Sequence, residues 1–241
     1  MPPARILTAT IVLAVLLPLA PQASGYEATT VVDGATIQGK VVFTGPPPPP
    51  RKVIPTKDRE VCGSGVREVE QILLSRDKAV QDAVVFLKKV EKGKAWPKPA
   101  QTPALENLKC DFVPHVQVVA VGSDLEIVNS DNVLHNTHGF LDRVTVFNLA
   151  MPNQGQRIKK PLKRPGLVRV ECDAHGWMLG WVYVVENPYY AVTAKDGAFA
   201  LKDVPPGSYT LVAWQEYTGF VESPVTVKGK EVRSITVDLK K

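Results

Sequence analysis

Hydrophobic positions in this chain recur in short alternating runs, and the 3.6-residue period of amphipathic helices is nearly absent. Glycine, proline, aspartate and asparagine separate the runs, as turn residues separate strands. The runs lie at residues 36–43, 80–87, 116–121, 125–128, 144–149, 167–171, 181–185, 210–214 and 225–239. This spacing predicts an all-β protein made of one or two sandwiches.

The first 25 residues differ from the rest and predict a secretory signal peptide (1–25). Arg5 is the one charge among them, residues 6–20 form an almost unbroken apolar run, and small residues follow at 23–25. The run is shorter than the about 20 residues that span a bilayer. We therefore expect a periplasmic or secreted protein without a membrane span after cleavage, with an uncleaved membrane anchor as the alternative.

The charge pattern and the lack of catalytic motifs exclude two classes of function. The formal charge of +5 comes from 29 basic and 24 acidic residues, and no Lys/Arg stripe is interleaved with aromatic residues, so we expect no nucleic-acid partner. The basic residues of 157–164 indicate either a docking patch for an acidic partner or, more simply, a solvated loop. No Ser/His/Asp order, carboxylate pair or phosphate-binding glycine loop emerges, and we expect no enzyme activity.

The odd cysteine count also carries information. Two of the three cysteines can pair in an oxidising compartment, and one is left over. We expect a disulfide between Cys62 and Cys110, which would stabilise the fold by roughly 4 kcal/mol. Cys172 is then free, with His175 and Met178 shortly after it. A free thiol exposed to oxidants is a liability unless something binds it.

A second histidine completes a set of metal-ligand types. Residues 121–129 read as a turn and a strand and lead to His135, whereas Cys172, His175 and Met178 follow the strand predicted at 167–171. Two imidazoles, one thiolate and a weak axial thioether suit both Cu(I) and Cu(II). Zinc accepts cysteine and histidine but has no use for the thioether. These donor types therefore suit copper better than zinc.

The order of these residues resembles that of the cupredoxins, the small blue-copper electron carriers. As in that family, His135 follows a strand that ends in Asn129, and Cys172, His175 and Met178 share the loop between two strands. The resemblance implies a Greek-key sandwich that binds one mononuclear copper ion through these four residues and transfers single electrons. The apolar loop is expected to leave a histidine edge for a redox partner.

Two features complicate the resemblance. Plastocyanin-type members usually have four residues between the loop histidine and the methionine, whereas only Gly176 and Trp177 stand there in this chain. His138, three residues after His135, is a possible extra ligand, a substitute for Met178, or a surface histidine without a role. A mononuclear site remains the prediction.

The two ends of the chain look like halves of one module. Asp196-Gly197 and Pro205-Pro206-Gly207 supply tight turns at fixed distances from alternating core residues. With residues 39–45 and 80–87, they resemble a carboxypeptidase regulatory-like (transthyretin-like) sandwich. We expect this sandwich to be discontinuous and to hold the cupredoxin-like domain as an insertion, with two adjacent domains as the alternative. The expected segments are 27–98, 107–187 and 188–241.

Three functions follow from these expectations. The first is an electron carrier whose partner is a redox protein, such as a c-type cytochrome or a membrane oxidoreductase. The second is a protein that holds or delivers copper without redox cycling. The third is a structural or carbohydrate-binding module in which the metal site is degenerate.

Overall fold

The computed structural model describes residues 25–241 and confirms the all-β prediction. Its strands form several sheets, and α1 (Arg59–Cys62) is the single α-helix that the structure describes. The expected signal peptide lies outside the described residues, apart from Gly25. Between residues 25 and 241, no helix has the length and apolar character needed to cross a membrane.

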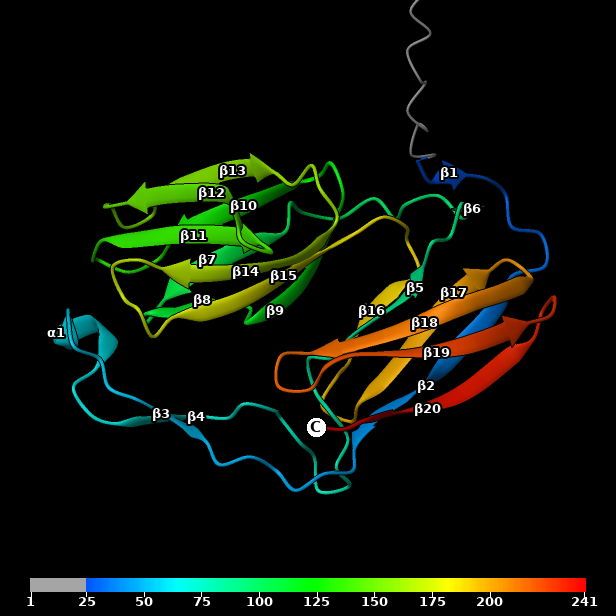
Figure 1. The fold of residues 1–241 in the computed structure, drawn as a ribbon. Helices are drawn as coiled ribbons and strands as arrows, with labels where there is room; N and C mark the ends of the chain where they lie inside the picture. Colours follow the sequence, from blue (N-terminus) through cyan, green and yellow to red (C-terminus); the bar gives the residue numbers. More distant parts are fainter. Residues whose placement is uncertain (1–24) are drawn as a thin grey trace, which may run out of the picture.

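Strands from both ends of the chain form what we call the terminal sandwich (Figure 1). Its two sheets have the orders β16-β5-β18-β19 and β17-β2-β20, and β2 pairs with β20 in parallel. Alternate residues of β2, among them Ile37, Val41 and Phe43, are buried between the sheets. The strands are β2 (Ala35–Phe43), β5 (Val84–Lys88), β16 (Tyr190–Val192), β17 (Ala198–Val204), β18 (Gly207–Gln215), β19 (Gly219–Val227) and β20 (Val232–Leu239).

The middle of the chain forms the central sandwich, drawn in green and yellow in Figure 1. Its sheets have the orders β13-β10-β7-β8 and β12-β11-β14-β15-β9. Leu125, Ile127, Val168 and Val170 are among the residues of its separate apolar core. The strands are β7 (Ala104–Leu108), β8 (Asp111–Val113), β9 (Val116–Ala120), β10 (Asp124–Asn129), β11 (His135–Leu141), β12 (Val144–Met151), β13 (Arg157–Pro161), β14 (Gly166–Cys172) and β15 (Leu179–Val185).

A segment between β2 and β5 leaves the terminal sandwich and reaches the central one (Figure 1). This arm, residues 51–69, contains β3 (Arg51–Val53), α1 and β4 (Arg67–Val69), and β3 pairs with β4. A disulfide joins Cys62 of α1 to Cys110 between β7 and β8, as the sequence predicts. The short strands β1 (Glu27–Ala28) and β6 (Lys92–Gly93) form a parallel pair elsewhere.

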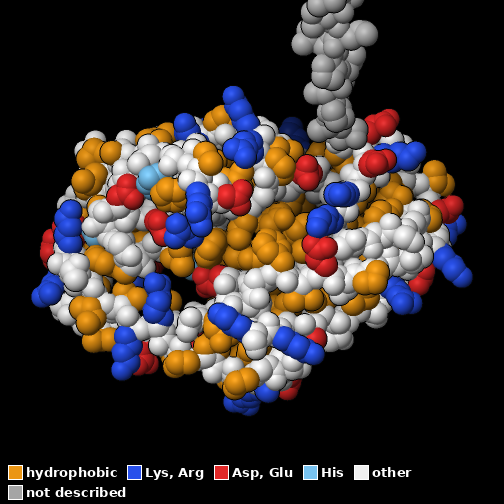
Figure 2. All heavy atoms as spheres, viewed as in Figure 1, with side chains coloured by type: hydrophobic (Ala, Val, Ile, Leu, Met, Phe, Trp, Pro, Cys, Tyr) orange, Lys and Arg blue, Asp and Glu red, His pale blue; other side chains and the backbone are white. Residues whose placement is uncertain are grey.

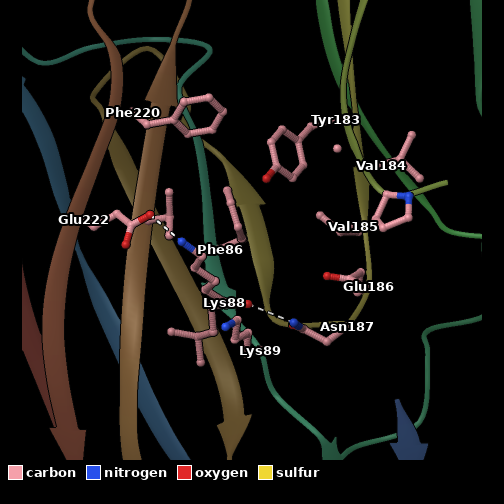
Figure 3. A pocket seen from close by; sticks show the side chains of 14 residues that line it. Phe86, Lys88, Lys89, Tyr183, Val184, Val185, Glu186, Asn187, Phe220 and Glu222 are labelled. Atoms are coloured by element: carbon pink, nitrogen blue, oxygen red, sulfur yellow. Dashed lines mark hydrogen bonds and ion pairs between the residues drawn. The ribbon is translucent and has the colours of Figure 1, made fainter. Parts of the chain in front are cut away.

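The two sandwiches meet at an aromatic seam. Trp181 and Trp214 contact edge to face with ring centroids 5.3 Å apart, and Glu216 accepts a hydrogen bond of 2.7 Å from the Trp181 indole. Apolar side chains gather in the hollow between the sandwiches (Figure 2). Phe220 and Tyr183 line a cleft of about 360 Å³ there (Figure 3), which contains none of the predicted metal ligands.

Candidate metal centre

Strand alternation brings His135 and Cys172 to one face of a sheet. In β11 the buried positions are His135, Thr137, Gly139 and Leu141, so these side chains point into the central sandwich. Thr137 lies directly opposite Cys172, the last residue of the antiparallel strand β14. His135 is two residues before Thr137 and therefore shares the inward face with Cys172.

A tight loop then returns His175 to the same place. The His175 N–H donates to the Cys172 carbonyl at 3.2 Å, and the Met178 N–H donates to the His175 carbonyl at 2.9 Å. The result is a buried cluster of three donor atoms. Sγ of Cys172 lies 3.7 Å from Nδ1 of His135 and 3.6 Å from Nδ1 of His175, and the two Nδ1 atoms are 3.1 Å apart.

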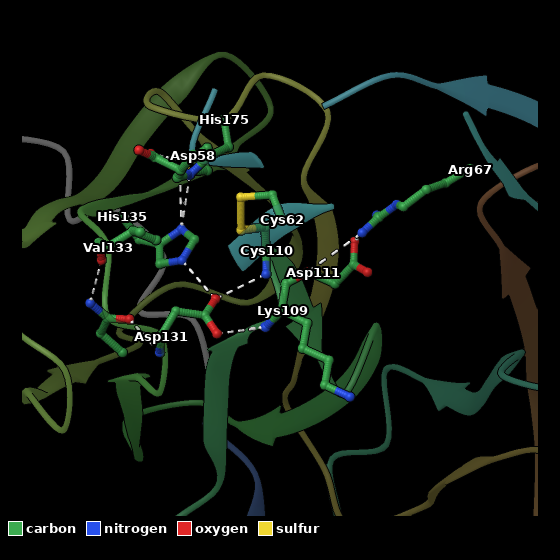
Figure 4. Close-up of a disulfide and its surroundings, with 12 residues drawn as sticks. Asp58, Cys62, Arg67, Lys109, Cys110, Asp111, Asp131, Val133, His135 and His175 are labelled. Carbon is green, nitrogen blue, oxygen red and sulfur yellow. Dashed lines mark hydrogen bonds and ion pairs between the residues drawn. A yellow bond between two sulfur atoms is a disulfide. The ribbon is translucent and has the colours of Figure 1, made fainter. Parts of the chain in front are cut away.

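Both imidazoles are held from behind by a carboxylate (Figure 4). Nε2 of His135 lies 3.0 Å from Oδ2 of Asp131, and Nε2 of His175 lies 2.9 Å from Oδ2 of Asp58. A carboxylate only accepts hydrogen bonds, so each Nε2 carries the proton and each Nδ1 is left with a lone pair. Both lone pairs therefore face the sulfur of Cys172.

Asp131 is itself fixed by the backbone around it. Its two carboxylate oxygens accept hydrogen bonds from the N–H groups of Lys109 at 2.7 Å and Cys110 at 2.9 Å. The Asn129 side chain accepts the Asp131 N–H at 3.0 Å and donates to the Met151 carbonyl at 2.9 Å. The loop before His135 is thus held in one conformation before any metal binds.

Burial dominates the electrostatics of the cluster. It lowers the pKa of His135, against the opposing effect of Asp131, and favours the neutral ring. It raises the pKa of the Cys172 thiol, although the Asn136 N–H, which donates to Sγ at 3.4 Å, acts in the opposite direction. Two nitrogen lone pairs only 3.1 Å apart repel each other unless a proton or a cation lies between them.

The donor set fits a metal ion. Metal–imidazole bonds are about 2 Å long, so one ion can lie between nitrogens 3.1 Å apart and also reach the sulfur. Two other groupings of possible ligand atoms include Cys110, but this residue is bonded to Cys62 in the disulfide and offers no thiolate. The triad of His135, Cys172 and His175 is therefore the candidate centre.

The other two predicted ligands, Met178 and His138, lie in different places. Met178 is buried in the same apolar core as Cys172. His138 occupies a position of β11 that points to the opposite face from His135, because the two are three residues apart in a strand. Its ring forms hydrogen bonds with Asp173 at 3.1 Å and Thr145 at 2.9 Å instead, so His138 is not part of the donor set.

Sequence reasoning missed the two carboxylates. Asp131 stands four residues before His135, where a polar residue in a ligand-bearing loop was a usable signal. Asp58 is 117 residues from His175 and has no local pattern that connects it to the site. The expected histidine edge is also absent from the surface, because both ligand imidazoles are fully buried.

One protein-family model matches part of the chain. The family model Polysaccharide lyase family 4, domain II matches residues 173–234, about a quarter of the chain, most of it in the terminal sandwich. The finer resemblance of that sandwich to carboxypeptidase regulatory-like domains stays a prediction. No curated protein matches the chain.

Solved structures similar to the chain include cupredoxins. An amicyanin from Paracoccus versutus (Thiobacillus versutus) is 20% identical over 44% of this chain and 100% of its own, with a TM-score of 0.33. A purple cupredoxin from Nitrosopumilus maritimus is 22% identical over 34% and 99%, with a TM-score of 0.32. The Cu-containing nitrite reductase of Thermus scotoductus SA-01 is 22% identical over 42% of this chain but only 25% of its own, with a TM-score of 0.32. Likeness at this level assigns no ligand or activity to this chain.

Proposed function

We propose that the central sandwich binds one copper ion through His135, Cys172 and His175, with Met178 as a further ligand, and that the protein transfers single electrons. The observation that carries this proposal is the convergence of two imidazole lone pairs and one unpaired thiol in a fully buried site. Nitrogen and thiolate donors in this combination suit both oxidation states of copper.

The chain contributes rigidity and exclusion of water. His135 and Cys172 belong to neighbouring strands, and the loop that carries His175 is closed by backbone hydrogen bonds. Bound copper would supply a one-electron couple, and donors that move little keep the cost of each electron transfer low. Loading requires the Cys172 proton to leave, because thiolate is the ligand form.

We also propose that the protein is exported and meets a redox protein, such as a c-type cytochrome or a membrane oxidoreductase. The signal-like residues 1–25 and the disulfide between Cys62 and Cys110 support an oxidising compartment. Catalysis is no part of the proposal.

A role in holding copper without redox cycling is the second candidate. It is favoured by the complete burial of His175 beneath Asp58, which leaves no ligand edge at the surface. A reversible midpoint potential, measured by protein-film voltammetry on the copper-loaded chain, would support electron transfer. Copper that is bound tightly but cannot be cycled would support holding.

Optical and EPR spectra after Cu(II) addition test the proposal. We expect one copper per chain and an intense thiolate-to-copper absorption that Cys172→Ser abolishes. His138→Gln serves as the matched control and should keep the absorption, because this ring lies outside the donor set. Binding without the absorption in the wild-type protein would contradict a thiolate-ligated centre.

A further inference from the structure

The outer nitrogen of His175 has an unusual partner. Oδ2 of Asp58 lies 2.9 Å from Nε2, although the two residues are 117 positions apart and belong to different parts of the fold. The His135 ring, by comparison, is held by Asp131 of the same loop. One ligand of the candidate centre thus depends on a segment that the central sandwich does not contain.

The arm presents Asp58 with its side chain unused by its own backbone. Asp58 adopts the left-handed conformation with φ of 50°, which aspartate tolerates better than most residues. Its carbonyl accepts the N–H groups of Val61 at 3.0 Å and Cys62 at 2.8 Å, whereas its carboxylate makes no capping bond to α1. The carboxylate is therefore directed at His175 rather than at its own helix.

Two tethers hold this part of the arm against the central sandwich. The first is the disulfide between Cys62 and Cys110, whose sulfurs lie within 4.8 Å of a ring nitrogen of His175. The second is the ion pair of Arg67 and Asp111 at 2.7 Å (Figure 4). Cys110 also donates its backbone N–H to Asp131. The disulfide therefore joins the arm that holds His175 to Cys110, whose backbone N–H helps to hold Asp131.

We propose that Asp58 is a positioning residue for His175: it fixes the ring with its proton on Nε2 and its Nδ1 lone pair toward the metal, and it covers the ring from solvent. This inference deepens the proposed function and rests on it where copper is concerned. The placement of the proton follows from the contact alone, because a carboxylate offers no hydrogen to the ring.

The consequence for a bound metal follows from the same contact. A carboxylate that accepts the outer N–H of a ligand histidine raises the basicity of the coordinating nitrogen and fixes the ring orientation. Loss of such a partner typically weakens metal binding 10- to 100-fold. Since Cu(II) gains more from a basic nitrogen than Cu(I), loss of Asp58 should also raise the midpoint potential.

Nitrogen-15 NMR of the full metal-free chain tests the positioning role without copper. We expect the wild-type His175 ring to show a protonated, exchange-protected Nε2. In Asp58→Ala we expect a mixture of tautomers and loss of protection. Asp58→Asn retains an acceptor oxygen and should restore the tautomer. Wild-type tautomer and protection in Asp58→Ala would overturn the proposal.

Copper measurements on the same variants distinguish the role of Asp58 from the proposed copper binding of the protein. Asp58→Ala should bind Cu(II) about 10- to 100-fold more weakly than wild type, with a raised potential and an altered EPR spectrum. Asp111→Ala is the matched control, since it removes the arm's ion pair to Arg67 with the same change of charge and leaves the hydrogen bond between Asp58 and His175 in place. Unchanged affinity and potential in Asp58→Ala would overturn the effect on the metal. A wild-type protein that binds no copper would overturn the proposed function and leave the NMR result standing.

Discussion

The two histidines of the candidate centre are equally buried but are held by different parts of the molecule. Asp131 supports His135 from within the same loop and is fixed by two backbone N–H groups of the central sandwich. Asp58 supports His175 from the arm, a quarter exposed to solvent. All three ligands therefore belong to the central sandwich, whereas the support of one imidazole comes from a tethered segment.

Removal of the disulfide should have the largest effect on the difference between the two histidines. It spans 48 residues, and a loop of that length stabilises by about 4 kcal/mol on the chain-entropy model. We expect Cys62→Ala with Cys110→Ala to lose about this much free energy of unfolding in urea denaturation. His175 should lose its protection from solvent exchange, whereas His135 should keep it. Equal loss at both rings would contradict the division between sandwich and arm.

Replacing Asp131 and Asp58 in turn should lower the free energy of unfolding by different amounts. Asp131→Ala removes the acceptor of three donors, two of them fully buried, and should lower the free energy of unfolding by about 3 kcal/mol. Asp58→Ala removes one contact at the edge of the arm and should cost about 1 kcal/mol. Urea denaturation of both variants measures the difference. Similar losses would show that the arm is as integral to the fold as the loop.

The smallest expected effect lies at the seam beside the arm. Burial lowers the pKa of His115, but the hydrogen bond to Glu216 at 2.9 Å and the charge of that carboxylate, with smaller contributions from the Leu179 backbone and from Asp82, outweigh burial and raise the pKa. Arg51 and Val69 of the arm line the same depression. Weakening the contact between His115 and Glu216 should therefore destabilise the arm more than the interior of the central sandwich.

The sign of the pH dependence follows from the raised pKa. The stabilisation by His115 is fully present below the pKa of the unfolded chain and is lost as the pH rises through the folded pKa. The free energy of unfolding of wild type relative to His115→Gln should be greater at about pH 5.5 than at about pH 8.5. Glu216→Gln should remove this dependence. A difference that grows with pH would contradict the assignment.

The strands with clear alternation were predictable from sequence. The run at 36–43 became β2, and the run at 116–121 became β9 within a residue. For the basic residues near 157 the sequence predicts a docking patch or a solvated loop, but Arg157–Pro161 forms β13, at the edge of its sheet. An edge strand exposes alternate charged side chains and offers little apolar pattern to detect.

The metal ligands and the carboxylate Asp58 also differ in how far the sequence predicts their positions. Cys172 ends a strand that alternation predicts and His175 follows it in the loop, whereas His135 begins β11, for which the sequence shows no alternating run. The order of the ligand types along the chain still allowed their meeting to be expected from sequence. Asp58 could not, because its place depends on how the arm crosses between two sandwiches and on the disulfide that fixes it. Strand periodicity carries no information on such a crossing.

X-ray absorption at the copper edge tests whether Cys172, His135 and His175 coordinate the ion. Copper-loaded wild-type protein should show one short sulfur bond and scattering from two imidazole rings, and Cys172→Ser should lose the sulfur bond but keep the rings. A first shell of oxygen and nitrogen alone in the wild-type protein would contradict coordination by Cys172, His135 and His175.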